Sequence, residues 1–124
     1  MTLIEIYDDL HTEFPDISET ADLMHRELWG EVDQQNVYHW FESLANSLNG
    51  RMQKNADVML FSGVFECLRR AYIQGDSHIQ DCVNVSFTEN LFWKVEASKA
   101  RPYWDVFPDI LKNLYIGFHS RAPA

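Results

Sequence analysis

Apolar residues recur at helical spacing along almost the whole chain. In the first segment they form one stripe with a period near 3.6 residues, which predicts an amphipathic helix. Thr2 can cap this helix and Pro15 ends it, while Asp8 and Asp9 project away from the apolar stripe into solvent. The stripe is formed by Leu3, Ile6, Tyr7, Leu10 and Phe14.

Three further helices follow from the same periodicity. A short second helix is predicted from the cap Ser18 to Gly30, a third over about 36–52 and a fourth over about 57–73. Gly75 ends the fourth helix, and Asp76 or Ser77 caps the next one, which is typical of an αα-hairpin. The apolar residues expected on the second helix are Leu23, Met24, Leu28 and Trp29.

The segment 77–95 has apolar residues on most sides of a helical projection, which is typical of a central helix. VNVSF (83–87) alternates briefly as a strand would, but its neighbours favour a helix. Ser86, Glu89 and Asn90 then lie partly inside, and we expect them to tie helix ends or loops together because buried polar groups need hydrogen bonds.

The end of the chain is predicted to hold one more helix. EASKARP (96–102) is interpreted as a connection, and the last helix either begins near Pro108 or follows a short turn at 102–106. The pattern as a whole predicts an all-α protein: residues 1–124 form a single compact domain of five to six helices around a HEAT-like central αα-hairpin.

Composition supports one folded domain without cofactor or disulfide. With 124 residues and 46% hydrophobic residues, the chain can bury a core that needs no metal. Cys67 and Cys82 are interpreted as buried free thiols of a reducing cytosol, and the sequence does not say whether they are close in space. The start MTLIEIYDDL lacks the pattern of a signal peptide, and no apolar run is long enough to span a membrane, so a cytoplasmic location is expected.

Charge is unevenly distributed along the chain. The net charge is −9, and residues 1–33 contain ten acidic residues but only one basic residue, Arg26. The remaining residues 34–124 are balanced, with nine acids and nine bases. Because a surface of this sign repels phosphate and anionic lipid, nucleic acid and membranes are poor partners, and a protein with a basic surface is a good one.

A charged helix face usually only solubilises a protein, and that interpretation stays open here. Two features favour an interface: the charge has one sign, and aromatic residues accompany it, as at binding hot spots. The predicted binding residues are Asp8, Asp9, Glu13, Asp16, Glu19, Trp29, Glu31, Asp33 and Tyr38.

Signs of catalysis are weak. No HExxH, CxxC, GxSxG or Gly-rich phosphate loop is present, so no catalytic residue, metal ligand or cofactor is predicted. Glu89 is the one carboxylate that an apolar setting could convert into a general acid, although satisfaction by neighbouring donors is the plainer interpretation. Three carboxylate and histidine pairs have helical spacing but are also common on solvated faces: Asp8/His11, Asp22/His25 and His39/Glu42.

FECLRRAYIQGDSHIQDCVNVSFTENLF, with its Ser-Phe-x-Glu-Asn-Leu pattern at 86–91, and the final VFPDILKNLYIGF resemble small bacterial all-helical domains. Such domains are similar to immunity proteins of toxin systems, including contact-dependent growth inhibition. The resemblance covers 65–118 best and implies a cytoplasmic protein, monomeric when free, that binds and occludes a cognate toxin. A basic nuclease would suit the acidic segment. The alternatives are a metal-dependent enzyme that uses His and carboxylate pairs between helices, and an adaptor that has no toxin partner.

Overall fold

The computed structural model describes all residues 1–124, and it contains helices and no strands. The helix count is higher than the predicted five to six, because the last third of the chain is divided into shorter elements. The seven α-helices and the single π-helix η1 are α1 (Leu3–Glu13), α2 (Pro15–Trp29), α3 (Val37–Gln53), α4 (Met59–Gln74), α5 (Ser77–Asp81), η1 (Cys82–Thr88), α6 (Ala97–Val106) and α7 (Asp109–His119).

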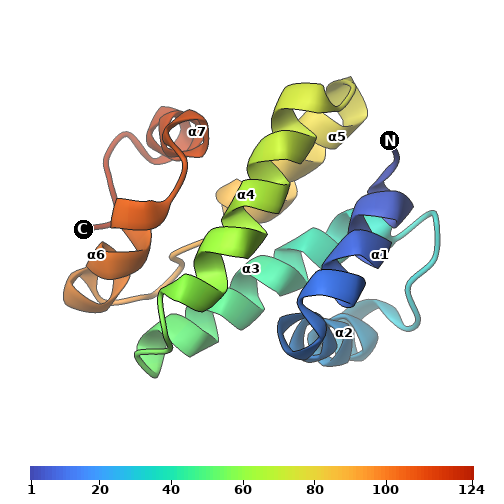
Figure 1. The fold of residues 1–124 in the computed structure, drawn as a ribbon, viewed down its shortest axis with the longest axis horizontal. Helices are drawn as coiled ribbons and strands as arrows, with labels where there is room; N and C mark the ends of the chain where they lie inside the picture. Colours follow the sequence, from blue (N-terminus) through green and yellow to red (C-terminus); the bar gives the residue numbers. More distant parts are fainter.

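Helices α3 and α4 run through the middle of the molecule and separate its two ends (Figure 1). The pair α1 and α2 lies on one side of them, and the pair α6 and α7 lies on the other. The acidic first quarter of the sequence and the C-terminal helices are therefore at opposite ends of one domain.

Helix α3 is the centre of the core. It packs most extensively against α2 and η1, and Trp40, Phe41 and Leu44 are fully buried. Its exposed positions are few, because neighbouring helices cover it on most sides. The sequence predicted that 77–95 would be the central helix, but in the structure the central helix is α3.

Local signals explain the α1–α2 corner. The Thr2 hydroxyl accepts a hydrogen bond from the Glu5 amide at 3.2 Å, so Thr2 caps α1 as predicted. Pro15 does not merely end α1: it is the first residue of α2, where a proline costs no hydrogen bond. The predicted cap Ser18 is wrong, because Ser18 is buried and its hydroxyl donates to the Leu10 carbonyl at 3.0 Å.

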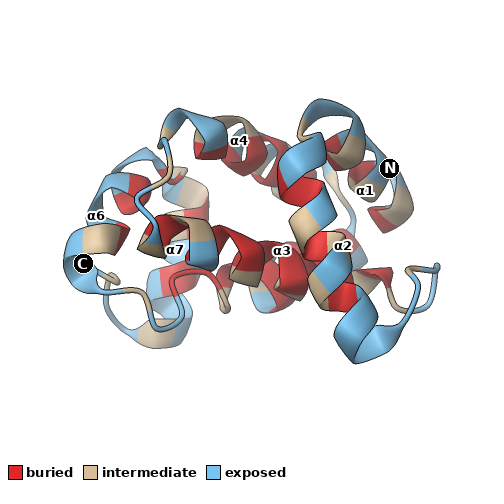
Figure 2. Ribbon diagram, turned by 90° about the horizontal axis from the view of Figure 1, so that it is seen from below, coloured by how far each residue is buried: buried red, intermediate tan, exposed pale blue.

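The buried face of α2 also differs from the predicted one. Ile17, Ser18, Ala21 and His25 face the core. The larger apolar residues predicted for this face point outwards, with exposed fractions of 54% for Leu23, 70% for Leu28 and 46% for Trp29, while Met24 is partly buried. Along α2, exposed stretches alternate with buried ones, and the end that leads into the following loop is exposed (Figure 2).

The predicted fifth helix breaks up after one turn. Asp76 caps α5 by accepting a hydrogen bond from the Ile79 amide, but α5 continues as the π-helix η1 and then as turns over 89–94. The β-branched residues of VNVSFT disfavour a regular α-helix. The Ser86 hydroxyl donates to the Tyr38 carbonyl at 2.7 Å and thus ties η1 to α3, as expected for this polar residue. Helices α4 and α5 are joined through Gly75 and Asp76 and contact each other, and η1 continues directly from α5.

The predicted connection 96–102 is instead the start of α6, which contains Pro102. Tertiary contacts compensate for the proline: Ala100, Tyr103 and Trp104 are buried at spacings of three and four residues, and the Tyr103 hydroxyl donates to the Ala56 carbonyl at 2.6 Å. Pro108 lies just before α7, which agrees with a last helix that begins near it.

Both cysteines are buried and unbridged, as predicted. Burial raises the pKa of the Cys67 thiol to about 11 and also raises that of Cys82. None of the helices has the length and apolar character needed to cross a membrane.

Candidate functional site

The predicted acidic residues all lie on the outside of the molecule. We call the side chains of Asp8, Asp9, Glu13, Asp16, Glu19, Glu31 and Asp33 the acidic surface; each of these residues is exposed. They follow from the helix pattern, since they occupy positions away from the apolar stripes of α1 and α2 or lie in the loop between α2 and α3.

Three groups make up the acidic surface. Asp8, Asp16 and Glu19 are on the outer sides of α1 and α2. Asp9 and Glu13 turn towards α4, where they line a small pocket of about 120 Å³ with Arg70 and Cys67. Glu31 and Asp33 are in the loop beyond the far end of α2, about 20 Å from its first turn at 1.5 Å per residue. The seven residues therefore form an extended band rather than one cluster, and we call this surface the acidic band.

Basic residues of the later helices form no ion pair with these carboxylates, although Arg70 of α4 lines the same pocket as Asp9 and Glu13. One ion pair involves the acidic surface, between the Arg26 guanidinium and Glu31 at 3.4 Å, and Arg26 belongs to the same segment. Arg51 approaches α2 but donates to the Asp16 carbonyl and the Thr20 hydroxyl, not to a carboxylate. Six of the seven carboxylates are therefore without an ion pair.

Exposed apolar side chains accompany the acids. On the outer side of α2, Leu23 lies four residues from both Glu19 and Glu27, so the three share one helix face. At the end of α2, Leu28 and Trp29 are exposed beside the loop that carries Glu31. The Trp29 indole stacks on the His39 ring at 4.1 Å between centroids and 6°, which holds the indole in one orientation.

Tyr38 is the one predicted binding residue that the structure does not bring to this band. Its hydroxyl donates to the Asp81 carboxylate at 2.6 Å, and its carbonyl accepts the bond from Ser86. Burial and the Asp81 carboxylate raise the pKa of Tyr38. Tyr38 thus joins α3 to α5 and η1.

A polar network under the acidic band connects α1, α2 and α3. The Asp22 carboxylate accepts hydrogen bonds from the His11 Nε2 at 2.8 and 2.9 Å and from the buried Trp40 indole at 2.8 Å. The other His11 nitrogen, Nδ1, faces the Tyr7 carbonyl at 2.7 Å. Both His11 nitrogens face acceptors, so both bonds form only when the ring carries two protons and a positive charge.

The i, i+3 pairs of the sequence did not reveal this network, since His11 pairs with Asp22 eleven residues away and not with Asp8. Burial and the Asp22 carboxylate raise the pKa of the Tyr7 hydroxyl, which lies beside the His11–Asp22 pair. Tyr7 also packs edge-on against Trp40 at 4.9 Å. The network fixes the α1–α2 pair that presents the acidic band.

His25 is fully buried, and neither of its ring nitrogens has a hydrogen-bond partner. Burial lowers the pKa of His25, against the smaller opposite effects of Asn36 and of the Asp22 and Asp33 carboxylates. The neutral ring is therefore the form that the folded protein holds.

The neutral state of His25 makes stability depend on pH. In the unfolded chain the His25 ring titrates near 6.5, and in the folded protein at lower pH, so the unfolded state binds the proton first. Stability should fall by up to about 1.4 kcal/mol per pH unit from this group as pH drops below 6.5. Urea unfolding of His25→Leu at pH 7 and pH 5 should show a smaller loss than the wild type. A loss as large as in the wild type and in the exposed control His78→Gln would contradict the assignment.

No three His, Cys, Asp or Glu side chains come together in a way that could hold a metal ion. Glu89 is partly buried, and its pKa is raised by burial while His119 opposes the shift. Its backbone carbonyl accepts a hydrogen bond from His119 at 3.1 Å, so part of the expected tying role of Glu89 falls to its main chain.

The fold and this band together define an all-helical domain with a lopsided acidic exterior. The chain belongs to the family described as "Domain of unknown function (DUF7674)", whose model matches residues 7–121. No curated protein and no solved structure shows a significant match to it.

Proposed function

We propose that this protein acts by binding a protein with a basic surface through the acidic band on α1, α2 and the 30–36 loop. One observation carries the proposal: seven exposed carboxylates lie there, and none of them is ion-paired with a base from residues 34–124. A surface that only solubilises a protein usually mixes both signs of charge.

The band has the composition of an interface. Its carboxylates attract a cationic partner over distance and speed the encounter. Leu23, Leu28 and Trp29 supply exposed apolar area that a bound partner can cover, and aromatic residues of this kind dominate binding energy. The action is occlusion of the partner's basic site, without chemistry on it.

An immunity protein that blocks a cognate bacterial toxin is the specific role that we propose. The support is the resemblance of 65–118 to such domains, with the α4 and α5–η1 hairpin as a HEAT-like scaffold, and the acidic band, which suits the phosphate-binding site of a nuclease. The protein would be a cytoplasmic monomer that meets its partner inside the same cell. The toxin should then be encoded directly upstream of this gene.

Two other candidate functions can be distinguished from the proposed one. A metal-dependent enzyme needs convergent ligands, and the carboxylate and histidine pairs of this chain do not form such a group. An adaptor without a toxin partner would bind through the same band but would have no toxin gene beside it.

Trp29→Ala should weaken the complex with the upstream gene product by about tenfold or more, because the exposed indole is the anchor of the band. Calorimetric titration measures the Kd. Trp93→Ala removes an exposed indole from the other end of the molecule and is the matched control. The same variants, expressed together with the toxin, should lose protection of the cells in the same order.

Two results would contradict the proposal. One is an upstream product that does not bind the wild-type protein. The other is a complex that Trp93→Ala weakens and Trp29→Ala does not, which would place the interface at the C-terminal end.

A further inference from the structure

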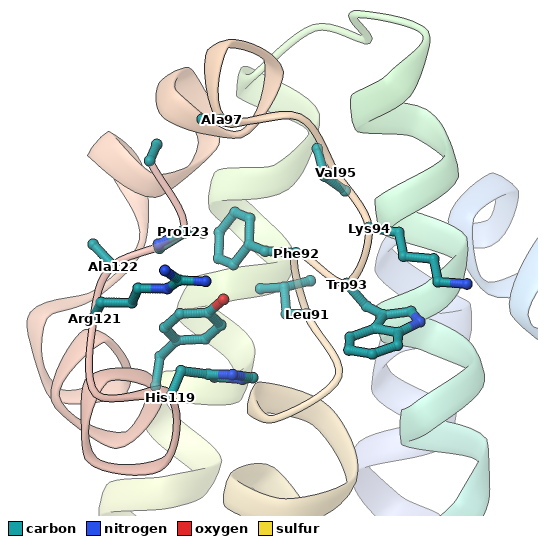
Figure 3. A pocket seen from close by; sticks show the side chains of 12 residues that line it. Leu91, Phe92, Trp93, Lys94, Val95, Ala97, His119, Arg121, Ala122 and Pro123 are labelled. Carbon is teal, nitrogen blue, oxygen red and sulfur yellow. The ribbon is translucent and has the colours of Figure 1, made fainter.

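A pocket of about 520 Å³ opens at the end of the molecule opposite the acidic band. Three segments line it: the connection 91–97, the end of α7 with Tyr115 and His119, and the C-terminal residues 121–124 (Figure 3). Its volume lies in the range of pockets that bind small molecules, about 300–1,000 Å³.

The floor of the pocket is aromatic and firmly packed. Phe92 and Tyr115 meet edge to face at 5.6 Å between centroids, and both contact the Trp104 ring behind them at 5.7 and 5.4 Å. Edge-to-face contacts of this kind fix ring orientations. The floor is therefore preformed, although the two rings are largely covered, with exposed fractions of 4% for Phe92 and 6% for Tyr115.

One wall is built from unusual backbone. Phe92 and Lys94 adopt left-handed conformations with φ of 68° and 57°. Such conformations are costly for bulky residues, and they gather at functional sites. Two α3 side chains hold this wall in place: the Asn49 carbonyl oxygen accepts from the Phe92 amide at 2.7 Å, and the Gln53 amide donates to the Lys94 carbonyl at 2.7 Å.

A free cation faces the floor. Arg121 forms no ion pair and no hydrogen bond, and its side chain extends towards Phe92 (Figure 3). Its charge acts on Tyr115, whose pKa is raised by burial and lowered in part by Arg121. Trp93 and Lys94 project to the other side of the connection (Figure 3). The His119 ring already has partners within the protein, since it stacks on Tyr115 at 4.1 Å and donates to the Glu89 carbonyl.

The surroundings of the pocket are also positive. Lys94 and Arg121 line the pocket, and no Asp or Glu side chain does. This end attracts anions while the other end repels them. The pocket and the acidic band therefore suit ligands of opposite charge.

We propose that this pocket binds a small organic carboxylate that carries a flat or aliphatic apolar group. The guanidinium of Arg121 matches the two oxygens of a carboxylate, and the apolar part of the lining, eight of its twelve residues, is available to contact the apolar group. The site is independent of the proposed function, because it shares no residue with the acidic band.

Calorimetric titration of the full chain with benzoate, 3-phenylpropionate and hexanoate tests the proposal. Benzamide, which has the ring without the charge, and inorganic phosphate, which has charge without an apolar group, are the matched ligands. Arg121→Gln removes the cation, and Arg101→Gln removes an exposed arginine of α6 outside the pocket as the control.

The expected result is saturable binding of at least one carboxylate, weakened about tenfold or more by Arg121→Gln and unchanged by Arg101→Gln. Benzamide and phosphate should bind more weakly than that carboxylate. The proposal is overturned if none of the three carboxylates binds, if benzamide or phosphate binds equally well, or if Arg121→Gln has no effect. Binding of a peptide carboxyl terminus in place of all three carboxylates would also overturn it.

Discussion

Asp22→Ala should lower the free energy of unfolding by about 2–4 kcal/mol. The change removes the acceptor for the His11 ring and for the Trp40 indole. Trp40 is fully buried, so its N–H would lose its partner away from water. His11 would lose the partner of its Nε2 atom. Urea unfolding followed by circular dichroism measures the change.

Asp22→Asn is the informative companion. An asparagine can still accept from Trp40 through its oxygen and can donate through its nitrogen to a neutral His11, whose other nitrogen keeps its bond to the Tyr7 carbonyl. The Asn variant should therefore lose much less stability than the Ala variant. Asp16→Ala, on the outer side of α2, should change stability by less than about 0.5 kcal/mol.

The network would be misassigned if Asp22→Ala and Asp16→Ala had the same small effect. Equal, large losses for Asp22→Asn and Asp22→Ala would show instead that the negative charge, and not the hydrogen-bond geometry, is what stabilises the α1–α2 pair.

Reversal of three outer carboxylates, Asp8→Lys, Asp16→Lys and Glu19→Lys together, should slow association with the basic partner by about 10- to 100-fold at low salt. The three side chains are exposed and none has an ion pair, so the fold should survive the change. Stopped-flow mixing gives the association rate constant, and circular dichroism confirms the helical content.

A matched triple variant separates position from net charge. Glu66→Lys, Asp105→Lys and Asp109→Lys change the total charge by the same amount at exposed positions of α4, α6 and α7. Their surface ion pairs contribute little to stability. If this control slows association as much as the first triple does, steering depends on net charge alone and the acidic band has no special role.

The sequence predicts α1, α3 and α4 well because each has a continuous apolar stripe. These helices bury large side chains at a regular period of 3.6 residues, so the apolar period in the sequence identifies the buried face of each helix. Helix α2 shows the limit of this reasoning. Apart from Ile17, its core face consists of the small or polar residues Ser18, Ala21 and His25, while Leu23 and Leu28 point to solvent. A hydrophobic pattern alone assigns these residues to the wrong sides.

Tertiary contacts decide the region from 82 to 106, which the sequence describes less well. The π-helix and Phe92 after it donate hydrogen bonds to acceptors on α3, which is more than forty residues away in the chain. Helix α6 forms despite Pro102 because Tyr103 and Trp104 are buried in the core. Helix propensity depends on the local sequence alone, so it cannot predict elements that distant residues stabilise.

The sequence likewise predicts one part of the candidate site and not the other. The exposure of the acidic surface is predictable, since solvent-facing positions follow from the helix period. The place of Tyr38 and the pairing of His11 with Asp22 depend on how α1, α2, α3 and α5 meet, and single-helix spacing does not contain that information. The C-terminal pocket has no short motif, because its lining comes from three separate segments.

The dependence of the association rate on ionic strength, measured for the wild-type protein and the product of the gene directly upstream, tests the central claim most directly. If the uncompensated carboxylates of α1, α2 and their loop guide a cationic partner, the rate constant should fall about tenfold or more as salt rises from low to physiological concentration, while dissociation changes little. A rate constant that stays level across this range would contradict the claim.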